Sequence, residues 1–225
     1  MAIKISGNTV INARNIQNVG INNWLIEDQI ELNFLNQIQK FLDENIKHFP
    51  KDKIGYSTIG NNCEQYWIKG GENNFEFSSL VWENINNEIK KIFLKELQNL
   101  LKYENLKLNL VSSWTVVGEE NTYHKLHDHS GGFDGFSAVI YIRVPQLSGT
   151  DSYHSNRINF VMHADPYSKF LVNESPNIIS IDPNVGKILI FPRHMIHGTY
   201  PQPKGIRQTL NLEYNFDFDS AQTSK

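Results

Sequence analysis

The chain has 225 residues, with 21 lysines and arginines against 24 aspartates and glutamates, and a formal net charge of −3 at pH 7. This balance provides no basic face for phosphate groups, so we expect neither nucleic acid nor a membrane as a partner. No apolar run approaches the roughly 20 residues that a spanning helix needs. Because Cys63 is the only cysteine and residues 1–15 lack the apolar core of a signal peptide, we expect a cytoplasmic protein without disulfides.

The first half of the chain contains two segments with helical periodicity. Residues 29–46 and 83–102 repeat apolar side chains at spacings of three and four, which places those side chains on one stripe of each helix. Each stripe must cover an apolar surface elsewhere in the chain. Residues 55–77 lie between the two segments and are rich in glycine and asparagine, which predicts turns and leaves room for a short hairpin.

From residue 106 the pattern changes to an alternation of apolar and polar residues, which is typical of strands. Six such segments follow one another without a long helix: 106–117, 136–144, 157–164, 177–182, 186–193 and 207–216. Short successive strands favour an antiparallel sandwich or barrel. We therefore expect an α+β, mainly β, fold in a single domain over 1–225, with a helical support region over 1–105 and a β core over 106–218.

Histidines gather in the segment YHKLHDHSGGFDGFSAVIYIRVP, which covers residues 123–145. Alternate residues of a strand point to the same side, so His127 and His129 would project together and Asp128 would point away. This is the geometry of a chelating pair, and a third ligand should come from elsewhere in the sequence. His197 can supply it, because it follows an apolar strand and precedes the loop YPQPKG.

An arginine follows that loop. The chain returns as IRQTLNLEYN, so His197 and Arg207 flank one hairpin connection and should be near neighbours on paired strands. A buried arginine there would need an anion. Its planar guanidinium matches a carboxylate in bidentate fashion, and an arginine beside a metal suits an anionic cosubstrate that is chelated to that metal.

With these residues the chain resembles the iron(II)/2-oxoglutarate-dependent oxygenases, in particular a branch found in marine bacteria and their phages, the cyanophages. The resemblance extends over residues 113 to 215, about half of the chain. Its motif positions are Ser113-Trp114, Gly118, Tyr123-His124, His127-x-His129, Ser137-Ala138, Tyr141, Pro145, Asp165-Pro166, Pro183, Gly186, Phe191-Pro192, His197, Pro201, Arg207 and Asn215.

The resemblance implies a double-stranded β-helix, the jelly roll of cupin-like proteins, with N-terminal buttressing helices. Iron(II) would be held at the open end by His127, His129 and His197. Arg207 would bind the far carboxylate of the cosubstrate 2-oxoglutarate, and Tyr141 is a weaker candidate for the same carboxylate. Dioxygen would be the other cosubstrate, the prime substrate would be a small molecule or a protein, and the enzyme would work in the cytoplasm of a bacterium or a phage-infected host. A homodimer is left open.

The chain departs from the family at one ligand. Most members have His-x-Asp, two histidines and one carboxylate, where this chain reads His127-Asp128-His129. Three imidazoles leave the site one negative charge short. The carboxylate could come from Asp134 in the adjoining glycine loop, or from Asp128 if the strand breaks there, or the site could prefer another metal.

Three functions remain open on the residues alone. The first is a 2-oxoglutarate-dependent dioxygenase, in particular a hydroxylase, the second is a three-histidine cupin oxygenase without a keto acid, and the third is a non-catalytic metal- or sugar-binding β-sandwich. Arg207 separates the first two, since only the keto acid needs that cation, although Arg207 could also pair with a surface glutamate. Trp114 is expected in the core. Four further histidines are expected at the surface or beside the ligands: His124, His154, His163 and His194.

Overall fold

The computed structural model describes residues 2–5, 9–12, 24–52, 58–59, 63–71, 73–101, 106–129, 135–147, 155–162 and 177–218. The described residues do not include Asp134, His154, His163 or the Asp165-Pro166 pair. The helices are α1 (Leu32–Asn45), the 3-10 helix η2 (Ile46–His48) and α2 (Leu80–Leu101). The strands are β1 (Ala2–Ile5), β2 (Thr9–Asn12), β3 (Ile26–Gln29), β4 (Lys51–Asp52), β5 (Thr58–Ile59), β6 (Cys63–Gly70), β7 (Phe75–Glu76), β8 (Leu106–Gly118), β9 (Tyr123–His124), β10 (Gly135–Arg143), β11 (Ile158–Met162), β12 (Asn177–Ile181), β13 (Lys187–Pro192), β14 (His197–Thr199) and β15 (Arg207–Phe218).

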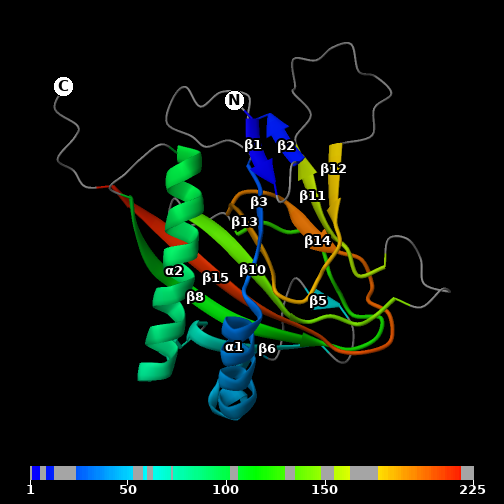
Figure 1. Cartoon of the computed structure of the whole chain (residues 1–225). Helices are drawn as coiled ribbons and strands as arrows, with labels where there is room; N and C mark the ends of the chain where they lie inside the picture. Colours follow the sequence, from blue (N-terminus) through cyan, green and yellow to red (C-terminus); the bar gives the residue numbers. More distant parts are fainter. Residues whose placement is uncertain are drawn as a thin grey trace.

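The main sheet contains eight strands, and every pairing in it is antiparallel. Its order is β3-β13-β10-β15-β8-β6-β4, and β7 pairs with β6. The long strands β8 and β15 lie side by side at its centre, with β10 next to them (Figure 1). Strands from both sides of residue 106 therefore build one sheet.

Each of the six strands expected beyond residue 106 is present, but the region before it contains more β-structure than its sequence indicated. Residues 63–70 form β6, a full strand that pairs with the central strand β8, where turns and a short hairpin were expected. Residues 26–29 form the edge strand β3, so the first helix begins at Leu32 and not at residue 29. The hairpin of β1 and β2 was not expected either.

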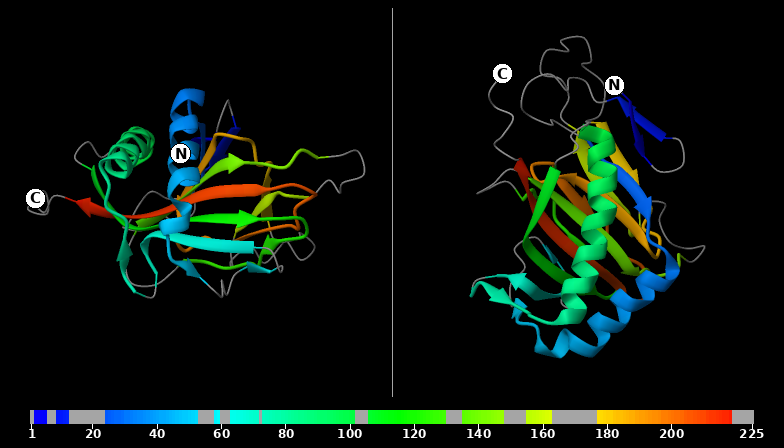
Figure 2. Two further views of the ribbon diagram at one scale, coloured as in Figure 1. Left: turned by 90° about the horizontal axis from the view of Figure 1, so that it is seen from below. Right: turned by 60° about the vertical axis from the view of Figure 1, so that its left-hand side comes forward.

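The two helices lie on one face of the main sheet (Figure 2). Their apolar stripes and the even-numbered residues of β10 form one buried core, as the periodicity predicted. Leu42 of α1 and Phe93 of α2 are fully buried in it, and the ring of Phe93 meets Phe136 edge-on at 5.6 Å between centroids. None of the described helices is both long and apolar enough to cross a membrane.

A second, three-stranded sheet in the order β12-β11-β14 packs against the opposite face of the main sheet. Phe160 of β11 and Phe191 of β13 meet there edge-on, with ring centroids 4.8 Å apart. Two antiparallel sheets with helices on the outer face of one of them form the double-stranded β-helix that was expected. Because side chains alternate along β10 and β15, their odd-numbered residues face the space between the sheets.

Candidate active site

A cavity of about 580 Å³ lies between the two sheets. Four odd-numbered residues of β15 line it, together with odd-numbered residues of β10 and side chains from β6, β8, β13 and β14. The lining residues include Trp67, Trp114, His124, His127, Asp128, His129, Tyr141, Phe191, Arg193, His197, Thr199, Arg207, Thr209, Asn211 and Glu213.

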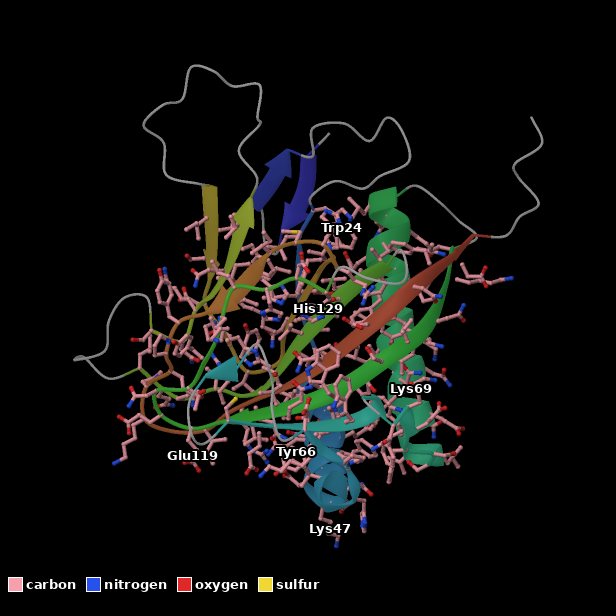
Figure 3. All side chains as sticks on the ribbon, turned by 180° about the vertical axis from the view of Figure 1, so that it is seen from behind. Trp24, Lys47, Tyr66, Lys69, Glu119 and His129 are labelled. Carbon is pink, nitrogen blue, oxygen red and sulfur yellow. The ribbon has the colours of Figure 1, made fainter. Side chains whose placement is uncertain are left out.

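Three histidines converge at one end of this cavity. One donor atom of each of His127, His129 and His197 lies within 4.8 Å of the others. The backbones hold them there: His127 and His197 exchange two N–H···O bonds of 2.9 Å, and the N–H of His129 donates to the carbonyl of Arg193 at 2.9 Å. Figure 3 shows His129 near the centre of the fold, away from the peripheral Glu119. The structure thus brings together the three residues that the sequence singled out.

Two of the rings have a defined tautomer. Nδ1 of His127 lies 2.7 Å from the carbonyl oxygen of Lys125, and Nδ1 of His197 lies 2.9 Å from that of Met195. A carbonyl only accepts hydrogen bonds, so both Nδ1 atoms carry the proton and both Nε2 atoms keep a lone pair. Burial lowers the pKa of His127, and it lowers the pKa of His197 well below its usual value, with a further contribution from the neighbouring histidines. Neutral imidazole is the form that binds metals.

The third ring has a different partner. Nδ1 of His129 lies 2.5 Å from Oε1 of Glu213. The other oxygen of Glu213 accepts hydrogen bonds from Ser112 Oγ at 2.6 Å and from Arg193 Nη2 at 3.4 Å. Burial alone would raise the pKa of Glu213, but the hydrogen bonds from His129 and Ser112 and the charge of Arg193 lower it below its usual value. The ring of His129 also stacks on Trp114 at 5.7 Å between centroids.

These residues fit a divalent metal such as iron(II). Nε2 of His129 is buried and has no hydrogen-bond partner among the residues that the structure describes. A buried polar atom without a partner costs about 1–3 kcal/mol, so a ligand for it is expected. Three imidazole nitrogens that face one point match the nitrogen donors that iron accepts. The side chain of Asp128 is exposed and is not among the converging donors, and Asp134 lies outside the described residues.

Arg207 lies in the same cavity and is only 5% exposed. Its guanidinium donates to Asn156 Oδ1 at 3.1 Å and to Thr199 Oγ1 at 3.3 Å, both of which are neutral. Within the described parts of the chain, no carboxylate pairs with it, so the alternative of a surface glutamate partner does not hold. Burial lowers the pKa of Arg207, but a guanidinium stays charged in proteins. The cavity therefore contains a buried cation that no described carboxylate neutralises by direct contact.

The position of Arg207 relative to His197 corrects one expectation. The two residues do not lie on paired strands, because β14 pairs with β11 whereas β15 pairs with β10 and β8. The loop between them crosses from one sheet to the other, and the two residues line the same cavity from different sheets. Tyr141 of β10 also lines the cavity and is 1% exposed; burial raises its pKa, so its hydroxyl is protonated at neutral pH.

Sequence reasoning missed two features of this cavity. Trp67 and Trp114 form part of its wall, with ring centroids 5.3 Å apart. Trp114 is buried, as expected, but it borders the site. Trp67 was missed because it lies in a segment for which the sequence predicted turns.

The second missed feature is Glu213. It could have been found, because Glu213 and Arg207 are both odd-numbered residues of one strand and therefore face the same side. Of the other histidines, His124 lies beside His127 at 6.0 Å between ring centroids and His194 is exposed.

Comparison with known families matches residues 112–211 to the family described as "Putative 2OG-Fe(II) oxygenase". Comparison with curated proteins finds no match.

Solved structures of the same fold include an oxidoreductase of the 2OG-Fe(II) oxygenase family from Burkholderia pseudomallei, with a TM-score of 0.59 and 12% identity over 86% of this chain and 84% of that one. A Pseudomonas putida prolyl-4-hydroxylase has a TM-score of 0.56 and 10% identity over 85% of this chain and 91% of that one. HygX from Streptomyces hygroscopicus, with nickel, 2-oxoglutarate and hygromycin B bound, has a TM-score of 0.54 and 12% identity over 86% of this chain and 82% of that one. Identities this low show the shared fold alone.

The matched segment contains the three converging histidines and Arg207, and the fold around it is the double-stranded β-helix of the structures above. Over this segment and in this fold, the chain is similar to the 2OG-Fe(II) oxygenase family, enzymes that use iron(II), 2-oxoglutarate and dioxygen.

Proposed function

We propose that this oxygenase is a hydroxylase in which His127, His129 and His197 hold iron(II) and Arg207 binds the distal carboxylate of 2-oxoglutarate. One observation carries the proposal: a buried arginine that has no anionic partner among the described residues shares a cavity with three converging histidines, two of which offer the lone pair of Nε2 because their Nδ1 atoms donate to carbonyl oxygens. A dicarboxylate keto acid fits both features, since one end can chelate a metal while the other pairs with a guanidinium.

Bound iron(II) would supply the oxidising chemistry, in which one oxygen atom of dioxygen enters a C–H bond of the substrate and the other enters succinate, as 2-oxoglutarate loses carbon dioxide. The residues of the chain hold and orient the reactants. Arg207 fixes the keto acid at its far end, and the hydroxyl of Tyr141 can add a hydrogen bond to the same carboxylate. Phe160 and Phe191 pack against the ring of His197, at 5.8 and 4.8 Å between centroids, and exclude water from one side of the ligands.

Trp67 and Trp114 support a place for the prime substrate. Both rings line the cavity from β6 and β8, where Trp114 pairs with Asn211 of β15, whereas Arg207 lies four residues earlier in β15 and pairs with Gly118. The cavity volume of about 580 Å³ lies within the usual range for small-molecule sites and leaves room beside the keto acid. We therefore expect the substrate to enter past the two tryptophans.

A three-histidine cupin oxygenase without a keto acid is disfavoured. Such an enzyme would bind its substrate directly to the metal and would have no use for a buried Arg207. The narrower relationship with the branch from marine bacteria and phages, a cytoplasmic location and a homodimer all stay predictions from the sequence.

Anaerobic titration of the purified protein with iron(II) and then 2-oxoglutarate tests the proposal. Chelation of the keto acid to iron(II) should produce a charge-transfer absorption in the visible range, and exposure to air should then yield succinate even without a prime substrate. If iron binds and this absorption does not develop, the keto-acid site is wrong and the cupin alternative gains support. If the protein binds no iron, the metal site itself is refuted.

A further inference from the structure

The three converging histidines differ in what their second ring nitrogen contacts. His127 and His197 donate from Nδ1 to backbone carbonyls, whereas His129 faces the carboxylate of Glu213 at 2.5 Å. The side chains of His129 and Glu213 are only 14% and 10% exposed. Their contact is therefore shielded from water. An interaction with a charge is stronger in such a buried place than at the surface.

The sheet itself holds Glu213 in place. Glu213 of β15 lies opposite Ser112 of β8 and Ser137 of β10 in the register of the main sheet. Ser112 donates to its Oε2 at 2.6 Å, and Arg193 donates to the same oxygen at 3.4 Å. Oε1 is left to His129. A carboxylate fixed on both oxygens in this way orients the imidazole ring that it contacts.

The proton between the two groups determines what His129 offers to a metal. If Nδ1 donates to the carboxylate, Nε2 carries the lone pair, and this Nε2 is the buried atom without a hydrogen-bond partner in the described part of the chain. A carboxylate that accepts from a ligating histidine makes that imidazole a stronger electron donor. Two histidines and a carboxylate ligand would give the metal one negative charge. Here three imidazoles converge, and the nearest carboxylate, that of Glu213, lies one ring further out.

We propose that Glu213 supplies the negative charge of this metal centre through His129, in place of the carboxylate ligand of a His-x-Asp set. This inference rests on the proposed function. Glu213 is thus a positioning residue that also raises the electron density at the metal. The role that the sequence left open for Asp128 or Asp134 falls to a residue on another strand.

Titration with cobalt(II) alone tests this role without the keto acid or turnover. Glu213→Gln keeps the size of the side chain and removes its charge, and it should weaken cobalt(II) binding by about 10- to 100-fold and shift the ligand-field bands of the bound ion. With iron(II) and 2-oxoglutarate, the charge-transfer band should move to higher energy, since a less electron-rich metal gives up an electron less readily.

Glu27→Gln is the matched control. Glu27 is also a poorly exposed carboxylate of the main sheet, at 16%, and it pairs with Lys187 at 2.8 Å. Its variant should bind cobalt(II) like the original protein. Circular dichroism and thermal unfolding of the metal-free variants show whether each of them is folded.

A second variant separates charge from structure. His129→Asp combined with Glu213→Gln places one carboxylate at the metal and removes the outer one, so it should bind cobalt(II) more tightly than Glu213→Gln alone. If the double variant binds no better than the single one, Glu213 has a merely structural role and the proposal is overturned.

Unchanged affinity and spectra in Glu213→Gln would also overturn the proposal for Glu213, while the proposed oxygenase function would stand. If the original protein binds neither cobalt(II) nor iron(II), both proposals fail; if it binds metal but gives no charge-transfer band with 2-oxoglutarate, only the hydroxylase proposal fails.

Discussion

Arg207 Nη2 donates a hydrogen bond of 3.3 Å to Thr199 Oγ1, and Thr199 is the second residue after His197 in β14. Residues two apart in a strand point to the same side, so the ring of His197 and the hydroxyl of Thr199 face one cavity. The contact links the two sheets at the site. It also connects the cation proposed for the cosubstrate with the strand that carries a proposed metal ligand.

Substitution Arg207→Ala should leave iron(II) binding nearly intact and weaken 2-oxoglutarate binding. A charge-assisted bidentate pair lost from a buried site should cost about 2–5 kcal/mol. Arg207→Lys should recover only part of this energy, because an ammonium group cannot reproduce the planar fork. Anaerobic titration, read by the charge-transfer absorption, measures the affinity. Unchanged affinity in Arg207→Ala would remove the cosubstrate assignment.

Tyr141→Phe should have a smaller effect on the same titration. The hydroxyl is neutral because burial raises the pKa of Tyr141, and a neutral hydrogen bond contributes about 0.5–1.5 kcal/mol. We therefore expect a loss of 2-oxoglutarate affinity of about 2- to 13-fold. An affinity equal to that of the original protein would show that Tyr141 is only part of the wall.

His197→Ala should abolish tight iron(II) binding, because it removes one of three converging nitrogens. His194→Ala is the matched control: the same substitution three residues earlier, at an exposed position outside the converging set. Iron content after anaerobic loading and desalting distinguishes the two. Stoichiometric iron in His197→Ala would rule out the proposed triad.

The metal-free protein should lose stability as the pH falls below about 6.5. Burial depresses the pKa values of His127 and His197 in the folded state, so the unfolded chain binds protons there that the folded chain does not. The free energy of unfolding therefore rises with pH in this range and falls on acidification. Urea unfolding at pH values of about 7.5 and about 5.5 measures the difference. His197→Ala should show a smaller difference, and an equal one would place the pH dependence elsewhere.

Two leucines of α1 test the packing of the helix on the sheet. Leu42 is fully buried and Leu32 is 68% exposed, and both lie in the same helix. Leu42→Ala should lower the free energy of unfolding by about 2–5 kcal/mol, because it leaves a cavity in the core. Leu32→Ala should change it by no more than about 0.5 kcal/mol. Equal losses in chemical denaturation would mean that α1 does not pack on the sheet as described.

Alternation and helical periodicity identified much of the fold, because each records which face of an element is buried. The strand containing Tyr141 and the stripe containing Leu42 were both found in this way. The strand β6 was not, since most of its residues are only half buried and its sequence between glycines and asparagines lacks a clear apolar face. Its pairing with β8 is a tertiary contact that local sequence does not encode.

The site was predictable where its residues are close in sequence or share a motif, and not where they meet through the sheet. His127 and His129 are neighbours on one segment, whereas Glu213 reaches His129 across a separation of 84 residues. The expected pairing of His197 with Arg207 failed for a related reason. A short loop suggested a hairpin, but this loop passes from one sheet to the other.

Strand β15 carries both ends of the site on one face, with Arg207 near its start and Glu213 six residues later. Thr209 and Asn211 lie between them on the same face, and the neighbours of these residues, such as Leu210, point into the core beneath the helices. Substitutions can therefore change the proposed cosubstrate end and the proposed metal end independently during evolution. Insertion or deletion of one residue between Arg207 and Glu213 would affect both ends at once, because it would reverse the orientation of one end relative to the other and bury a charged group among apolar side chains. The length of this segment should thus vary among descendants of this chain far less than its composition.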